Sequence, residues 1–324
     1  MASLPSFLTP LPNRPNKGAY LNAVYHHPAP LGPAHCIYWP PKKPDVPPET
    51  VVIFIPGNPG LLDFYTPFLN ALYEKDATEN LAIIAQTHID HTPGVYKDTN
   101  PHSRHSLTSQ VHSAIEAFDA TVAEFRTSKV VVIGHSVGAW ITLQVLKERP
   151  NLISGIFLLF PTIAHIADTP NAKKLSNFFK PVPRRFIARF SHVGRHMPVW
   201  LLHRIVGMEW PISQVKVIRE LTKSPSSIRA TLRMGHEEML QIREPDVALL
   251  HEHRDRLWFY FAEHDDWVGK QKEYIINKLK PEAGSLRITY GDPKIPHAFS
   301  LNYGEEVAQQ CHQWLLQMNL TTTR

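Results

Sequence analysis

From residue 51 onward, short apolar runs rich in β-branched residues alternate with segments of helical periodicity. The runs are apolar at nearly every position, which is typical of parallel strands buried on both faces. Between the second and third runs, apolar residues from Leu107 to Phe125 recur at spacings of three and four, which predicts one face of a helix. This alternation predicts right-handed crossovers and a doubly wound, mostly parallel α/β sheet. The runs are Val51–Ile55, Leu81–Ala85, Lys129–Ile133, Gly155–Phe160, Arg256–Phe261 and Ser285–Tyr290.

The alternation stops near residue 161 and resumes near residue 256. We therefore expect a core built from residues 51–160 and 256–324, interrupted by an insertion at 161–255. Two further helices are predicted in the second half of the core, at about 268–280 and 303–318.

Residues 1–50 have a different composition, because the first 48 residues contain 12 of the 29 prolines. Proline donates no backbone N–H and disfavours helix at the residue before it. We expect an extended, irregular arm with room for edge strands, and the proline-free piece Ala34–Trp39 is the candidate for pairing at an edge of the sheet.

Composition excludes several classes of protein. Two cysteines, Cys36 and Cys311, cannot form a disulfide framework. No stretch reaches the ~18 apolar residues of a spanning helix, and the first residues lack the charged-then-apolar order of a signal peptide. We expect an intracellular protein that does not span a membrane.

The strongest local motif is Gly134-His-Ser-Val-Gly138, which directly follows a predicted strand and directly precedes an apolar helix. In this context a G-x-S-x-G sequence is typical of a nucleophile elbow. The turn raises the hydroxyl of Ser136 above the carboxyl edge of the sheet, at a helix N-terminus that favours developing negative charge. The sequence therefore predicts Ser136 as a nucleophile.

A nucleophilic serine needs a base, and the base needs an orienting acid; in this architecture they follow in the order Ser, acid, His. His297 is the histidine in the loop after the last predicted strand. The spacing before Val268 favours Asp265 as the acid, and Asp266 is the alternative, otherwise expected to cap the following helix.

The oxyanion hole is predicted in Ile55-Pro-Gly-Asn-Pro-Gly60, which follows the first core strand. The two prolines have no N–H, so the donors narrow to Gly57, Asn58 and Gly60. We choose the backbone N–H of Asn58, together with that of Val137, the residue after the nucleophile.

Four motifs together resemble the lipid droplet-associated hydrolase family of α/β-hydrolases, over about residues 50–318. They are Ile55–Gly60 with Phe64-Tyr65, Ser106-Leu-Thr-Ser-Gln-Val-His112, Gly134–Gly138 and Pro296-His-Ala-Phe299. The resemblance implies a helical cap at the insertion, a Ser136–Asp265–His297 triad and a lipid droplet surface as the site of action. It also implies neutral lipid esters, sterol esters or acylglycerols, as substrates.

The charge of the chain is concentrated in the insertion. Residues 161–235 carry 13 Lys and Arg against three acidic residues, so this segment has a net charge of +10 and the remainder of the chain −5. Aromatic and aliphatic residues alternate with arginines, as in segments that lie in a lipid interface. We predict such an interface at Phe178, Phe179, Arg184, Arg185, Phe186, Arg189, Phe190, Trp200 and Leu201.

The sequence thus predicts a serine esterase or lipase that works on lipid esters at a droplet surface, or at the endoplasmic reticulum, from the cytosolic face. Two alternatives stay open: a droplet-binding tethering protein with weak hydrolase activity, and a soluble carboxylesterase whose basic cap merely packs. We expect no cofactor, no metal and no nucleic-acid partner, because neither ligand spacing nor a nucleic-acid-binding motif is present.

Overall fold

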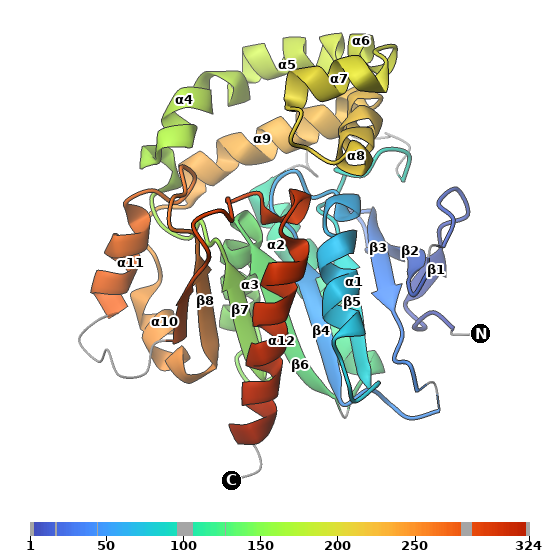
Figure 1. Cartoon of the computed structure of the whole chain (residues 1–324), viewed down its shortest axis with the longest axis vertical. Helices are drawn as coiled ribbons and strands as arrows, with labels where there is room; N and C mark the ends of the chain where they lie inside the picture. The colour runs from blue at the N-terminus through green and yellow to red at the C-terminus, as the bar shows by residue number, and fades with distance from the viewer. Residues whose placement is uncertain are drawn as a thin grey trace.

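The computed structural model describes residues 3–16, 18–43, 45–95, 106–126, 128–279 and 287–321. Within them, nine strands form one sheet in the order β1-β2-β3-β5-β4-β6-β7-β8-β9 (Figure 1). The six strands from β5 to β9 in this order run parallel. They correspond to the six predicted runs, although Ser285 and Leu286 of the last run lie outside the described residues. The parallel strands are β4 (Thr50–Ile55), β5 (Leu81–Gln86), β6 (Lys129–His135), β7 (Gly155–Leu159), β8 (Leu257–Phe261) and β9 (Arg287–Tyr290).

The proline-rich arm is more regular than predicted. It forms three antiparallel strands, β1 (Leu8–Pro10), β2 (Leu21–His26) and β3 (Pro33–Trp39). β3 contains the predicted piece Ala34–Trp39, but it lies inside the sheet, between β2 and β5. The expectation of an irregular arm was wrong because the prolines stand at strand ends and in turns, where no ladder N–H is lost.

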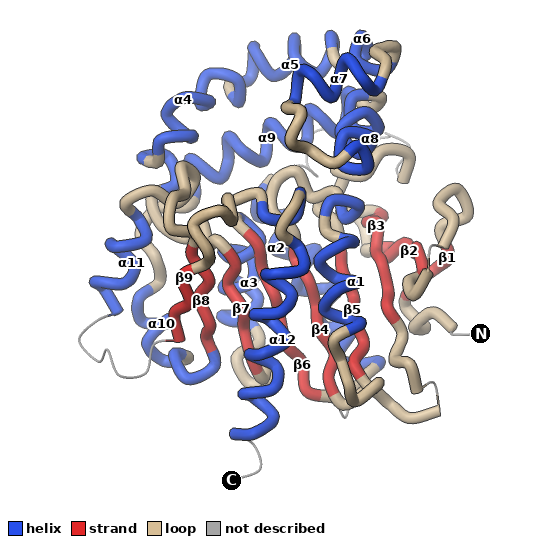
Figure 2. Tube along the Cα trace, in the orientation of Figure 1, coloured by secondary structure: helices blue, strands red, loops and turns tan. Residues whose placement is uncertain are grey.

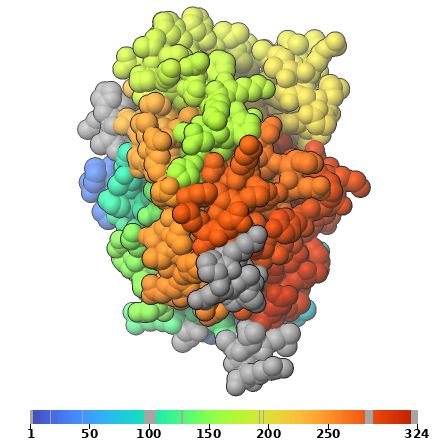
Figure 3. All heavy atoms as spheres, turned by 90° about the vertical axis from the view of Figure 1, so that its left-hand side faces the viewer, coloured from blue at the N-terminus to red at the C-terminus, as the bar shows by residue number. Residues whose placement is uncertain are grey.

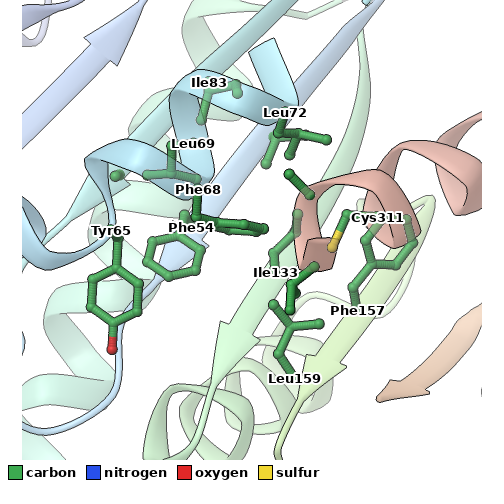
Figure 4. Close-up of a cluster of buried hydrophobic side chains, with 14 of the residues drawn as sticks. Phe54, Tyr65, Phe68, Leu69, Leu72, Ile83, Ile133, Phe157, Leu159 and Cys311 are labelled. Carbon is green, nitrogen blue, oxygen red and sulfur yellow. The ribbon is translucent and has the colours of Figure 1, made fainter. Parts of the chain in front are cut away.

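Helices cover both faces of the sheet (Figure 2). α1 (Thr66–Glu74) and α12 (Gly304–Thr321) pack against each other on one face. Figure 4 shows their contact with the sheet, where Phe54, Phe68, Phe157 and Cys311 meet in a buried cluster. The other face carries α2 (Leu107–Glu124), α3 (Val137–Glu148), α10 (Val247–Glu252) and α11 (Gln271–Leu279).

Six helices of the insertion form a cap above the carboxyl edge of the parallel strands (Figure 1). α4 and α5 pack against α9, on its side away from the sheet. Figure 3 shows the yellow-green residues of α4 and α5 above the orange residues of α11. The cap helices are α4 (Pro170–Phe179), α5 (Pro181–Phe190), α6 (His192–Arg195), α7 (Val199–Val206), α8 (Ile212–Thr222) and α9 (Pro225–Gln241).

The last part of the predicted insertion does not belong to this cap. α10 packs against α11 beside the sheet, and its Leu249 and Leu250 are buried in the core cluster on that face. The segment above the carboxyl edge of the sheet therefore ends with α9 at Gln241, 14 residues before the boundary at 255 that the sequence suggested.

Candidate active site

Ser136 lies in the sharp turn between β6 and α3. Its φ of 56° places a side-chain-bearing residue in the left-handed region of backbone space, a conformation that the surrounding structure must enforce. The flanking glycines make this possible: a Cβ at Gly138 would come within 3.0 Å of the carbonyl oxygens of Ile55 and Pro56. Since these are backbone atoms, only glycine allows α3 to pass so close to the end of β4.

Ser136, His297 and Asp265 form a hydrogen-bonded chain. His297 Nε2 lies 2.9 Å from Ser136 Oγ, and its Nδ1 lies 2.7 Å from Asp265 Oδ2. Burial alone raises the pKa of Asp265, but the neighbouring His297 and the backbone N–H groups of Trp267 and Val268 lower it overall. The carboxylate is therefore ionised at neutral pH and only accepts, so the Nδ1 of His297 carries the proton and Nε2 accepts from the serine hydroxyl.

The alternative acid, Asp266, has no hydrogen bond to His297 among the interactions described. Its backbone carbonyl accepts from Asn171 N, and the following helix α11 begins only at Gln271. Asp265 also provides the local cap that the sequence assigned to Asp266, because its Oδ1 accepts the N–H groups of Trp267 and Val268.

A second hydrogen-bonded chain, which the sequence analysis did not find, joins the histidine loop to the loop after β4. His135 Nε2 lies 3.0 Å from the carbonyl oxygen of His297, and its Nδ1 lies 2.8 Å from Tyr65 Oη, which accepts the N–H of Gly57. Since a carbonyl only accepts, Nε2 of His135 holds the proton and Nδ1 accepts from the tyrosine hydroxyl. Burial lowers the pKa of His135 to about 3, which keeps this ring neutral.

The same contacts limit which N–H groups of residues 56–60 face the nucleophile. The N–H of Gly57 is bound by Tyr65, and that of Gly60 by His91 Nδ1 at 3.0 Å. Pro56 and Pro59 have none, which leaves the N–H of Asn58 within this loop. The N–H of Val137, the first residue of α3, has no intrahelical acceptor and is the second donor the sequence named.

A cavity of about 290 Å³ opens between Ser136 and the cap. Ser136 and His297 lie in its wall, and most of the remaining wall is apolar. The apolar side chains come from both the core and the cap: Phe64, Ile166, Phe179, Trp210, Ile218, Met239, Trp267 and Leu301. The polar exceptions include Asn58 and the carboxyl of Glu238, which sequence analysis did not single out.

The predicted lipid-interface residues divide into two groups. Phe178, Phe186, Phe190 and Trp200 are exposed large apolar side chains, and Arg185 and Arg189 are exposed beside them. Phe179 differs from the prediction, because it lines the cavity and its ring packs on Gly235 of α9. Arg184 also turns inward: it is half-buried, and its Nη1 donates to Phe179 O at 3.4 Å. Leu201 is half-buried.

The outer face of the cap carries further exposed apolar residues that the prediction omitted. They are Val182, Val193, Ile205 and Met208. Together with Phe178, Phe186, Phe190 and Trp200, these residues make up most of the exposed large apolar side chains in the described part of the chain, and all lie within residues 178–208. We call this surface the outer cap face.

Comparisons with known proteins show which family this chain resembles. Residues 48–300 match the sequence profile of a family described as lipid-droplet associated hydrolase. The chain is 28% identical over 287 residues to the lipid droplet-associated hydrolase of Homo sapiens, covering 81% of this chain and 83% of that protein. It is 29% identical over 289 residues to the one of Mus musculus, covering 85% and 87%.

Solved structures that resemble the chain are α/β-hydrolases. The 2-hydroxy-6-oxo-6-phenylhexa-2,4-dienoate hydrolase of Rhodococcus superimposes with a TM-score of 0.61 at 17% identity, over 91% of this chain and 98% of that one. The peroxisomal α/β-hydrolase Lpx1 of Saccharomyces cerevisiae gives 0.62 at 11% identity, over 94% and 88%. The predicted α/β-hydrolase fold is confirmed. Among the described residues, no helix is long and apolar enough to cross a membrane.

Proposed function

Since this chain belongs to the lipid droplet-associated hydrolase family, we propose that it is a serine esterase that cleaves lipid esters, sterol esters or acylglycerols, at the surface of lipid droplets. The observation that carries the proposal is the chain of hydrogen bonds from Ser136 through His297 to Asp265 at the wall of an apolar cavity.

The reaction follows from the positions of the donors. His297 Nε2 takes the proton of Ser136 as Oγ attacks the ester carbonyl, and Asp265 stabilises the imidazolium that forms. The N–H groups of Asn58 and Val137 bind the oxyanion. His297 then gives its proton to the leaving alcohol, which leaves an acyl group on Ser136. A water that loses its proton to His297 releases the fatty acid.

The outer cap face supports action at a lipid surface. Exposed apolar side chains lie on α4, α5, α6 and α7, and the exposed Arg185 and Arg189 lie among them. Anionic headgroups attract each arginine by about 1 kcal/mol, while buried apolar area supplies the remaining affinity. We propose that this face lies on the droplet, or on the endoplasmic reticulum, from the cytosolic side, with the cavity mouth close to the lipid.

The enzyme claim is tested by labelling with a fluorophosphonate probe. We expect the wild type and the control Ser154→Ala, an exposed serine just before β7, to be labelled equally, and Ser136→Ala not at all. Labelling that survives Ser136→Ala would refute the assignment of the nucleophile.

The substrate claim is tested with a panel of emulsified sterol esters and acylglycerols, assayed with the same three proteins. We expect Ser136-dependent release of fatty acid from emulsions. A preference for dispersed short-chain esters, with no gain at an emulsion surface, would favour a soluble carboxylesterase instead.

A further inference from the structure

The cavity above Ser136 contains a buried carboxyl group from the cap. Glu238 lies on α9 and is 6% exposed. Its Oε1 accepts the Asn58 Nδ2–H at 2.8 Å, and the same amide nitrogen donates to the backbone carbonyl of Thr231 at 3.0 Å. Thr231 and Glu238 are seven residues apart, about two turns, and so lie on one face of α9. The carbonyl of Thr231 points toward the C-terminal end of the helix and the side chain of Glu238 leans back toward its N-terminal end, so both acceptors reach the same nitrogen.

This amide is oriented by α9 alone. The carbonyl of Thr231 can only accept, which fixes the nitrogen side of the amide toward the cap. Asn58 Oδ1 is buried and has no hydrogen-bond partner within the described residues. Asn58 is also the residue whose backbone N–H is proposed to bind the oxyanion, so the cap helix holds the side chain of one of the two proposed oxyanion donors.

The surroundings of Glu238 favour an uncharged carboxyl. Burial raises its pKa to about 8, against the opposing effect of the hydrogen bond from Asn58. The other ionisable side chains of the cavity wall are Tyr65, His135 and His297. Burial raises the pKa of Tyr65 and lowers that of His135, so neither brings a charge at neutral pH.

The charged groups of the neighbouring helices do not line the cavity. On α9 itself, Glu237 pairs with Arg233 at 2.9 Å and accepts the N–H of Leu107 at the start of α2. From α5, Arg184 does not line the cavity, and burial together with the nearby charges of Arg233 and Arg229 lowers the pKa of its guanidinium. In the wall as described, α4 presents Phe179, α8 Ile218 and the turn before α4 Ile166, all of them apolar.

We propose that Glu238, as an uncharged carboxylic acid, is the positioning residue that couples the cap to the oxyanion hole by holding Asn58 in place. This inference rests on the proposed function and deepens it. An uncharged acid accepts the amide N–H without placing a negative charge beside the oxyanion that forms on the substrate. Ionisation of Glu238 disfavours that oxyanion, because like charges repel strongly in a cavity from which water is excluded.

The test uses Ser136-dependent hydrolysis of p-nitrophenyl butyrate by the full chain, measured as kcat and KM from pH 6 to pH 10. For the wild type we expect kcat to fall about tenfold between pH 7 and pH 9, as a group with a pKa of about 8 ionises. Glu238→Gln keeps an uncharged acceptor of the same shape, so its kcat at pH 7 should stay within about threefold and should not fall up to pH 9.

Two further variants separate positioning from folding. Glu238→Ala removes the acceptor and should lower kcat at pH 7 by about 10- to 100-fold, less than the 10²–10³ typical when an oxyanion donor itself is removed, while KM changes little. Glu237→Gln is the matched control: it changes the adjacent carboxyl on the same helix and should keep the pH profile of the wild type. Melting temperatures confirm that each variant is folded at the assay temperature.

The outcomes distinguish this inference from the proposed function. A Glu238→Gln profile that falls in parallel with the wild type, or a Glu238→Ala variant that melts lower but keeps its kcat, overturns the role of Glu238 while the nucleophile stands. Independent of activity, the ¹³C NMR signal of the Glu238 carboxyl, assigned by its absence in Glu238→Gln, should titrate near pH 8. A signal already ionised at pH 6 also overturns the inference. Absence of Ser136-dependent hydrolysis in the wild type instead refutes the proposed function, and this inference with it.

Discussion

Two phenylalanines on the outer cap face provide the sharpest test of lipid binding. Phe186 and Phe190 lie one turn apart on α5 and are 58% and 63% exposed. A phenylalanine has about 200 Å² of surface, so each leaves about 120 Å² for insertion, which at ~25 cal/mol per Å² corresponds to about 3 kcal/mol. If half of the exposed area of each ring enters lipid, each contributes about 1.5 kcal/mol and the two together about 3 kcal/mol. This free energy corresponds to about a hundredfold in the partition coefficient.

The assay is flotation of the double variant Phe186→Ser/Phe190→Ser with neutral-lipid emulsions coated with phosphatidylcholine. We expect its partition coefficient to fall about a hundredfold from the wild-type value. The fall should persist at high salt, because the lost interaction is apolar rather than electrostatic. The melting temperature should change little, since neither ring is buried in the fold.

Leu316→Ser is the matched control, because Leu316 is an exposed apolar residue near the C-terminal end of α12, away from the cap (Figure 1). It should float like the wild type. Equal flotation of the Phe186/Phe190 double variant and the wild type would refute the assignment of the outer cap face as the lipid-binding surface.

Three further variants test the site itself. Asp265→Asn should lower kcat at pH 7 by about 10⁴-fold, as in other Ser-His-Asp enzymes. Because the pKa of Asp265 is lowered in the folded state, its contribution to stability is present above pH ~4 and is lost as the pH falls further. The melting temperature of the variant should therefore fall less between pH 5 and pH 2 than that of the wild type. Tyr65→Phe leaves the buried N–H of Gly57 without its acceptor and should cost about 1–3 kcal/mol of unfolding free energy in urea titrations, with a lower kcat/KM. Gly138→Ala places a Cβ against the backbone of Ile55 and should cost about 3 kcal/mol or more in the same titration.

The parallel half of the fold could be predicted because its strands are buried on both faces. Such strands can be recognised without knowing which strands they pair with, because runs like Val130–Ile133 are apolar at every position. The motif at Gly134–Gly138 that follows this run also requires a strand before it and a helix after it. The antiparallel half could not be predicted in the same way. Whether a proline breaks a strand depends on whether its missing N–H faces a neighbour, as at Pro10 on the edge strand and Pro33 at the start of β3.

The candidate site likewise contains residues that the sequence indicates and contacts that it does not. Ser136, Asp265 and His297 could be named because each lies in the turn or loop after a strand whose carboxyl end is at the same edge of the sheet. The hydrogen bond between Tyr65 and His135 was not predicted, because the two residues are 70 positions apart in the chain. No periodicity or spacing in the sequence indicates which loops of one edge touch each other.

Adjacent residues of the cap show why its two surfaces could not be separated by pattern. Phe178 is exposed on the outer cap face, while Phe179 lines the cavity; Glu237 pairs with Arg233, while Glu238 holds Asn58. The two residues of each pair are chemically identical and have nearly the same neighbours in the sequence. Their side chains nevertheless point in directions about 100° apart, because consecutive residues of a helix differ by that angle. An ordinary surface helix has one apolar face, which identifies its buried side. The cap helices have exposed apolar residues on the outer cap face and further apolar residues at the cavity, so their sequence lacks the contrast that would orient them. Only the packing of α4 and α5 against α9 decides which side chain lines the cavity and which lies on the proposed lipid-binding surface.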